Sequence, residues 1–254
     1  MKQTTKRALK FVGTILPFGL VASFLATLYS LQNLAPEILE TIQGQNSKGV
    51  VIALMTVQTL VINVIVLGIL GYILADAVGL IKPFKWRKQS ILLGIGIGSA
   101  VGILLAIDPF TFGKFIPELS NTVAKECLTP LYLATGIFYG GVVEEIMLRL
   151  FMMSLIAYIL WKVFAKGATK ENIPTWVFVV ANIVAALLFA AGHIPATISL
   201  FGELTPLLLI RCFLLNGLGG IGFGYVYRKE GIYYSMVAHA FAHIVSKLLL
   251  FILL

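Results

Sequence analysis

The segment GGVVEEIMLRLF, residues 140–151, places two adjacent carboxyl groups and a guanidinium group inside an apolar run. Glu145 and Arg149 are four residues apart, so on a helix they share a face and can form an ion pair. Glu144 points about 100° away around the helix and has no such local partner. An unpaired carboxyl group in a low dielectric suits proton exchange near neutral pH. The two glutamates therefore have different expected parts: Glu144 reactive, and Glu145 bracing the helix with Arg149.

All three histidines of the chain follow these glutamates. His193 ends the segment FAAGH, and His239 and His243 lie four residues apart in VAHAFAH, so one helix would present both on the same face. Histidine transfers protons near pH 7 and is a common metal ligand. A lone histidine in an apolar helix is more often a core residue, but three histidines with a glutamate pair favour a functional site.

The elements that must position these groups are membrane helices. The chain has 254 residues, of which 59% are hydrophobic and 12% charged, about half the usual roughly 25% charged of a soluble domain. Continuous apolar runs of about 20 residues predict helical spans rather than the alternating strands of a barrel. We therefore expect an all-α, multi-pass membrane helix bundle, as a single domain over 1–254. It has about seven spans (seven to eight), near residues 11–32, 50–80, 89–107, 130–161, 174–194, 206–227 and 232–254.

The basic residues alternate from one connection to the next. Thirteen fall before span one or in the even-numbered connections, against three in the odd-numbered ones, which by the positive-inside rule predicts a cytoplasmic N-terminus. This distribution explains the net charge of +8 through topology and contact with anionic lipid, without a nucleic-acid partner. The two cysteines, Cys127 and Cys212, have no metal-ligand spacing and are expected to be free thiols.

Together the motifs resemble the CAAX prenyl protease and bacteriocin-processing family of intramembrane proteases. EEIMLR matches its EExxxR motif and FAAGH, from Phe189 to His193, matches FxxxH. HAFAH occupies the place of a third motif, in which asparagine usually follows histidine by four residues; here His243 stands in that position, and Asn216 is a candidate substitute for the missing amide. The resemblance covers about residues 130–250, and we expect the catalytic core there.

The resemblance implies an endopeptidase acting on a membrane-associated or lipid-anchored peptide or protein. Glu144 would be the general base, His193 would position the water, and His239 with His243 would stabilise the oxyanion. No metal is expected, since current understanding of the family favours a metal-free glutamate. Zinc bound by Glu144, His193, His239 and His243 is the alternative.

Two other functions are compatible with the sequence. A family member that has lost catalysis could act as a membrane binding partner or immunity factor, which the histidine at position 243 favours. A proton-coupled transporter could use the same ionisable groups as a relay, although no inverted repeat is visible. In each case the chain is a multi-pass integral membrane protein, of the cell membrane if bacterial.

Overall fold

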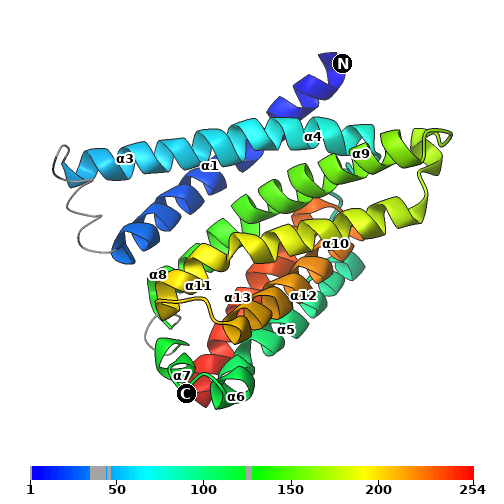
Figure 1. The fold of residues 1–254 in the computed structure, drawn as a ribbon. Coiled ribbons are helices and arrows are strands. Elements are labelled where there is room, and N and C mark those ends of the chain that lie inside the picture. Colours follow the sequence, from blue (N-terminus) through cyan, green and yellow to red (C-terminus); the bar gives the residue numbers. More distant parts are fainter. Residues whose placement is uncertain (1, 35–43, 45–46, 124–127) are drawn as a thin grey trace.

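The computed structural model describes residues 2–34, 44, 47–123 and 128–254, and within these ranges the regular elements are all helices (Figure 1). Cys127 lies outside the described residues, whereas Cys212 is a free, buried thiol as predicted. Seven helical stretches are long and apolar enough to cross a membrane: Gln3–Gln32, Lys48–Ala77, Lys88–Lys114, Pro130–Phe164, Thr175–Phe201, Pro206–Glu230 and Ile232–Leu253. The predicted count and order of spans are confirmed in the described part of the chain, and the protein is an integral, multi-pass membrane protein.

Five helical elements make up most of the first three spans. They are α1 (Lys2–Gln32), the sequence α3 (Lys48–Thr59), η1 (Leu60–Val66) and α4 (Leu67–Ala77), and α5 (Lys88–Ala106). After α5 the chain makes three short turns of helix, α6 (Asp108–Thr111), η2 (Phe112–Lys114) and α7 (Leu119–Thr122). These short elements lie beside the C-terminal end of the last helix in Figure 1.

The remaining four spans hold the candidate site. The fourth comprises α8 (Pro130–Thr135), η4 (Gly136–Glu144), η5 (Ile146–Met153) and α9 (Ser154–Phe164), and a short 3₁₀ turn, η6 (Lys170–Asn172), follows it. The fifth comprises α10 (Thr175–Gly192) and α11 (Ile194–Phe201), and the last two are α12 (Pro206–Glu230) and α13 (Ile232–Leu253). Prolines at Pro130 and Pro206 begin α8 and α12, where the absent N–H costs nothing, and the hydroxyl groups of Thr129 and Thr205 cap these helices.

The fourth span departs from the expected α-helix. Its central segments η4 and η5 are π-helical, with backbone hydrogen bonds to the fifth residue rather than the fourth. Hydropathy depends on which residues are apolar and not on the number of residues per helical turn. The sequence pattern therefore predicted where this span lies but not that its centre is π-helical. The span nevertheless keeps Glu145 and Arg149 on a common face, because four residues make a nearly complete turn in either helix type.

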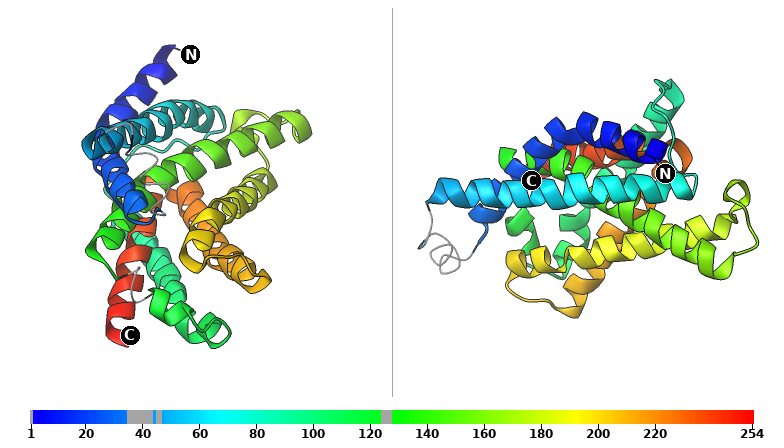
Figure 2. Two further views of the ribbon diagram at one scale, coloured as in Figure 1. Left: turned by 60° about the vertical axis from the view of Figure 1, so that its left-hand side comes forward. Right: turned by 90° about the horizontal axis from the view of Figure 1, so that it is seen from above.

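The fourth span also occupies the middle of the bundle. It packs against α1 and α4 on one side and against α10, α12 and α13 on the other (Figures 1 and 2). On the far side α5 runs along α13 through Gly94, Gly98 and Gly102, which approach the α13 backbone so closely that a Cβ at Gly102 would lie 2.8 Å from the carbonyl oxygen of Ala242. Without water to drive helices together, such small residues permit the close backbone approach that membrane helices need.

The fifth span is broken where the candidate histidine lies. In the structure α10 ends at Gly192, His193 occupies the break, and α11 continues to Phe201. The turn between α9 and α10 extends beyond the turn between α12 and α13 (Figures 1 and 2). The fifth span therefore starts farther out than α13, and His193, at its break, lines the same cavity as His239.

Candidate active site

One cavity, with a volume of about 410 Å³, is lined by most of the predicted site residues. Glu144, His193, His239 and His243 all line it, as do Phe189 and Asn216. These side chains come from four different spans, so the cavity exists only in the assembled bundle. Glu145 and Arg149 lie behind its wall, with side chains that are 0% and 1% exposed.

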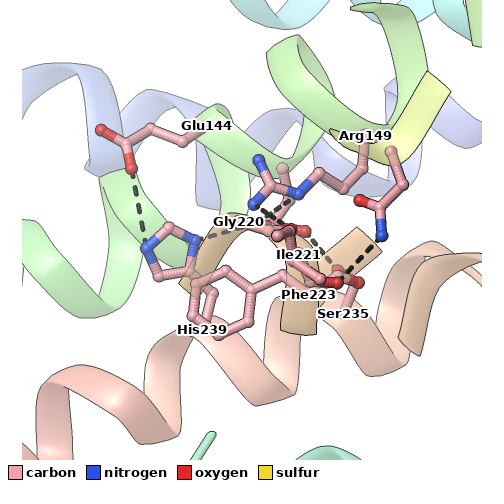
Figure 3. A network of polar contacts seen from close by, with 9 residues as sticks. Glu144, Arg149, Gly220, Ile221, Phe223, Ser235 and His239 are labelled. Carbon is pink, nitrogen blue, oxygen red and sulfur yellow. Dashed lines mark hydrogen bonds and ion pairs between the residues drawn. The ribbon is translucent and has the colours of Figure 1, made fainter. Parts of the chain in front are cut away.

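His239 lies between the two carboxylates. Its Nε2 is 3.6 Å from Oε2 of Glu144, and its Nδ1 is 2.9 Å from Oε1 of Glu145 (Figure 3). An ionised carboxylate can only accept a hydrogen bond, so Nδ1 carries the hydrogen and donates to Glu145. Nε2 is thereby directed toward Glu144 and the cavity. The side chain of Glu144 is 19% exposed and lines the cavity.

Glu145 is the centre of a buried polar network. Besides His239, it accepts a hydrogen bond from the hydroxyl group of Ser235 and lies 3.6 Å from Nε of Arg149. Oγ of Ser235 also lies 2.9 Å from the carbonyl oxygen of Phe223. The predicted pairing of Glu145 with Arg149 is present, but Glu145 does more than brace its own helix, because it also orients His239.

Arg149 ties this network to α12. Its Nη2 donates to the carbonyl oxygen of Gly220 at 3.2 Å, and its guanidinium group lies 5.0 Å from the ring centre of Phe189 and 5.6 Å from that of Phe223. A side chain at position 220 would crowd α10, since a Cβ there would lie 2.8 Å from the Cβ of Ala186. The buried charge is therefore held by one carboxylate, one carbonyl group and two aromatic faces.

Phe189 contacts two of the three histidines of the cavity wall, His193 and His239. Its ring centre is 4.6 Å from that of His193 and 5.9 Å from that of His239, edge-to-face in both cases. Nδ1 of His193 lies 2.9 Å from the carbonyl oxygen of Phe189, and a carbonyl group can only accept, so the Nε2 of His193 is left unprotonated in the neutral ring. Among the contacts of the described residues none joins His193 directly to Glu144; the two share the cavity.

His243 fits a slot made by two glycines of η4. Its ring is stacked on that of His239 at 5.3 Å, and a Cβ on Gly136 would lie 2.5 Å from its Nδ1. A Cβ on Gly140 would lie 3.0 Å from its Nε2 and 3.1 Å from Nε2 of His239. Alanine at either position would thus displace a histidine. Nδ1 of His243 is buried without a hydrogen-bond partner within the described part of the chain.

Asn216 does not take the place of the missing asparagine in this geometry. Its amide nitrogen lies 2.9 Å from the carbonyl oxygen of Cys212, one turn earlier on the same helix, and 3.6 Å from the sulfur of that residue. Asn216 lines the cavity, but within the described contacts it forms no hydrogen bond with His239 or His243.

Three features of the site were not predicted. Ser235 stands four residues before His239, and that spacing could have placed both on the face that meets Glu145. Gly136 and Gly140 precede Glu144 by eight and four residues, a stripe that could have indicated close packing. The ion pair between Asp108 and Arg211, which also line the cavity, has distances of 2.5–3.0 Å. It joins residues 103 positions apart, so no local sequence pattern indicates it.

The zinc alternative would draw its ligands from Glu144 and the three histidines. Among the described residues, no three histidine, cysteine, aspartate or glutamate side chains are grouped so that they could hold a metal ion. His239 is engaged at Nδ1 by Glu145, and His243 faces it as a stacked ring.

Comparison with known proteins connects this site with one family. Residues 126–245 match the family model described as type II CAAX prenyl endopeptidase, Rce1-like. No curated protein and no solved structure matches the chain. The matched segment contains the two glutamates, Arg149 and all three histidines, which the structure gathers around one cavity or directly behind it. This match supports the assignment of residues 126–245 to the CAAX prenyl protease and bacteriocin-processing family of intramembrane proteases.

Proposed function

We propose that this protein is an intramembrane endopeptidase that hydrolyses a peptide bond of a membrane-associated or lipid-anchored peptide or protein. Protease activity follows from the family; the mechanism and the class of substrate are our proposal. The observation that supports them is the position of His239 between the carboxylates of Glu144 and Glu145, in a cavity that His193 also lines. The catalytic core is proposed to coincide with the last four spans.

In the proposed reaction Glu144 takes a proton from a water molecule, and the resulting hydroxide attacks the carbonyl carbon of the substrate. His193 positions that water through its unprotonated Nε2, which accepts a hydrogen bond. In its protonated form His239 donates from Nε2 to the oxyanion of the tetrahedral intermediate, and His243 supplies a second donor in place of an asparagine amide. The C–N bond then breaks as the proton held by Glu144 passes to the departing nitrogen.

The location of the site is also part of the proposal. We propose that the end carrying the basic connections faces the cytoplasm, since thirteen basic residues mark it against three at the other end. His239 lies seven residues into α13 from that end, roughly 10 Å along the helix. Cleavage would therefore take place near the cytoplasmic side of the bilayer.

Replacing His193 with alanine tests the assignment of the water. We expect cleavage of a peptide precursor, co-expressed or reconstituted with the protein, to fall by about 10²-fold or more, because one of the groups that orient the water is lost. Product formation is measured by mass spectrometry, which also identifies the bond cleaved. The matched control is Asn182→Ala in the same span; its side-chain amide donates to the carbonyl oxygen of Ile221 and does not line the cavity.

The outcomes separate the alternatives. Cleavage by His193→Ala at the rate of the control would refute the assignment of this residue. Binding of the peptide by the unmodified protein without any product would identify a silent family member, and proton flux into liposomes in the absence of peptide would identify a transporter.

We further propose that the reaction needs no resident metal ion. The support is that no three histidine, cysteine, aspartate or glutamate side chains of the described residues are grouped so that they could hold a metal ion. We expect less than one zinc per ten chains by elemental analysis of purified protein, and unchanged cleavage after dialysis against a chelator. Stoichiometric zinc, with activity lost on chelation and restored by zinc, would contradict this.

A further inference from the structure

The segment from Lys82 to Lys88, between α4 and α5, combines exposed cations with exposed aromatic rings. Lys85, Arg87 and Lys88 are exposed, and the exposed fractions of Trp86 and Phe84 are 81% and 53%. Exposed tryptophan beside lysine and arginine is typical of the level of the lipid headgroups. Among the described residues the carboxylate that contacts the segment is Glu230, which lies 3.2 Å from Arg87 and 2.6 Å from the hydroxyl group of Ser90, so the segment keeps an excess of positive charge.

The segment is also docked on the turn between α12 and α13. Nζ of Lys82 donates to the carbonyl oxygen of Lys229 at 2.5 Å, and the hydroxyl group of Tyr234 donates to the carbonyl oxygen of Lys85. The ring of Phe84 lies 6.0 Å from that of Tyr234 in a stacked arrangement. Gly231, at the turn itself, has φ +102°, and a Cβ there would lie 3.2 Å from the Cβ of Lys82. The segment and the turn are therefore in direct contact through hydrogen bonds and stacked rings.

This contact leads directly to the candidate site. Ser235 follows Tyr234 in the chain and donates to Glu145, which in turn holds Nδ1 of His239. Any shift of the turn would thus be transmitted to the group that orients His239.

The cations of this region are crowded. Burial lowers the pKa of Lys82 from its ordinary value; Glu230 opposes this effect, and Arg87 and Arg228 add to it by repulsion. An added anion would relieve that repulsion. Phosphate groups accept strong, charge-assisted hydrogen bonds from lysine and arginine, which makes the headgroups of the surrounding bilayer the fitting source of that anion.

We propose that the Lys82–Lys88 segment binds the phosphate groups of anionic phospholipids, and that this binding holds the α12–α13 turn and His239 in the arrangement needed for catalysis. The effect on catalysis rests on the proposed function, whereas the binding surface does not.

Binding is tested by energy transfer from Trp86 to dansyl-labelled lipid. The chain has three tryptophans, so W161F/W176F leaves Trp86 as the sole donor. We expect at least twofold greater transfer to labelled phosphatidylglycerol than to labelled phosphatidylcholine, with at least half of the excess lost in K85Q/K88Q. The matched control is K6Q/K10Q, which removes two exposed charges at the same end of the bundle, on α1. Equal transfer to both lipids, or an equal loss in the control, would overturn the lipid site.

Coupling to the site is tested in vesicles of phosphatidylcholine with and without phosphatidylglycerol. We expect the anionic lipid to slow amide hydrogen exchange at residues 229–235 and to raise cleavage about threefold to tenfold in the wild type and K6Q/K10Q, with both effects reduced in K85Q/K88Q. Lipid preference without slower exchange would overturn the coupling. If no variant cleaved peptide in any vesicle, the proposed function would fail, while energy transfer and exchange would still decide the lipid site and its coupling to the turn.

Discussion

Glu144→Gln is expected to reduce peptide cleavage by about 10²–10⁴-fold, the range usual for loss of a general base. Glutamine keeps the size of the side chain and can still contact His239, but its amide cannot take a proton from water. The protein should remain folded in the membrane, because the side chain of Glu144 lines the cavity and is not part of the buried network around Glu145. Initial rates of product formation in proteoliposomes provide the measurement.

A matched control for this variant is Glu203→Gln, which makes the same chemical change at an exposed residue in the connection between α11 and α12. Its rate should equal that of the wild type. Cleavage by Glu144→Gln within a few fold of that control would exclude Glu144 as the base.

Arg149→Leu is expected to lower the free energy of unfolding by about 3–5 kcal/mol, the usual result of removing one partner from a buried ion pair. The side chains of Arg149 and Glu145 are 1% and 0% exposed, so Glu145 would be left charged among apolar groups with only His239 and Ser235 as partners. The carbonyl group of Gly220 would lose its side-chain donor as well. Unfolding of the purified protein in detergent, followed by circular dichroism, measures the change.

The double variant E145Q/R149L distinguishes charge from packing. Removing both charges can be nearly neutral, so this variant should be more stable than Arg149→Leu, although His239 would lose its anionic partner and cleavage would stay low. Stability as low as that of Arg149→Leu, or lower, would show that the cost comes from lost packing against Phe189 and Phe223 and not from an uncompensated carboxylate.

Much of the fold was predictable because lipid imposes a simple rule. A span must form all its backbone hydrogen bonds internally and be apolar over about 20 residues, so its position can be predicted from local composition. The seven predicted spans agree with the seven helical stretches of the described residues to within a few positions at most ends. The second span was predicted to reach residue 80, but its helix ends at Ala77. The residues after Ala77 form a turn, and hydropathy does not distinguish an apolar turn from a helix.

Part of the site was predictable for a similar reason. Glu145 and Arg149 meet because four residues complete about one helical turn, and His239 and His243 share a face on the same grounds. The motifs around Glu144 and His193 also indicated the family that residues 126–245 match.

The partners of these groups depended on the tertiary structure. The packing of α13 against η4 decides which carboxylate binds Nδ1 of His239. It places Glu145 and Ser235 near the Nδ1 side of the imidazole ring and Glu144 near the Nε2 side. The slot for His243 depends on two glycines of another span, and the depth of His193 depends on where α10 begins.

By itself, then, the sequence determined that this protein is a seven-span membrane helix bundle with ionisable groups at fixed positions on each helix, because span length, hydropathy and the helical repeat are local properties. Only the tertiary structure decided that Glu144, His193 and His239 share one cavity and that Glu145 orients His239, because those distances join side chains from different spans and follow from how the helices pack and at what depth each one starts.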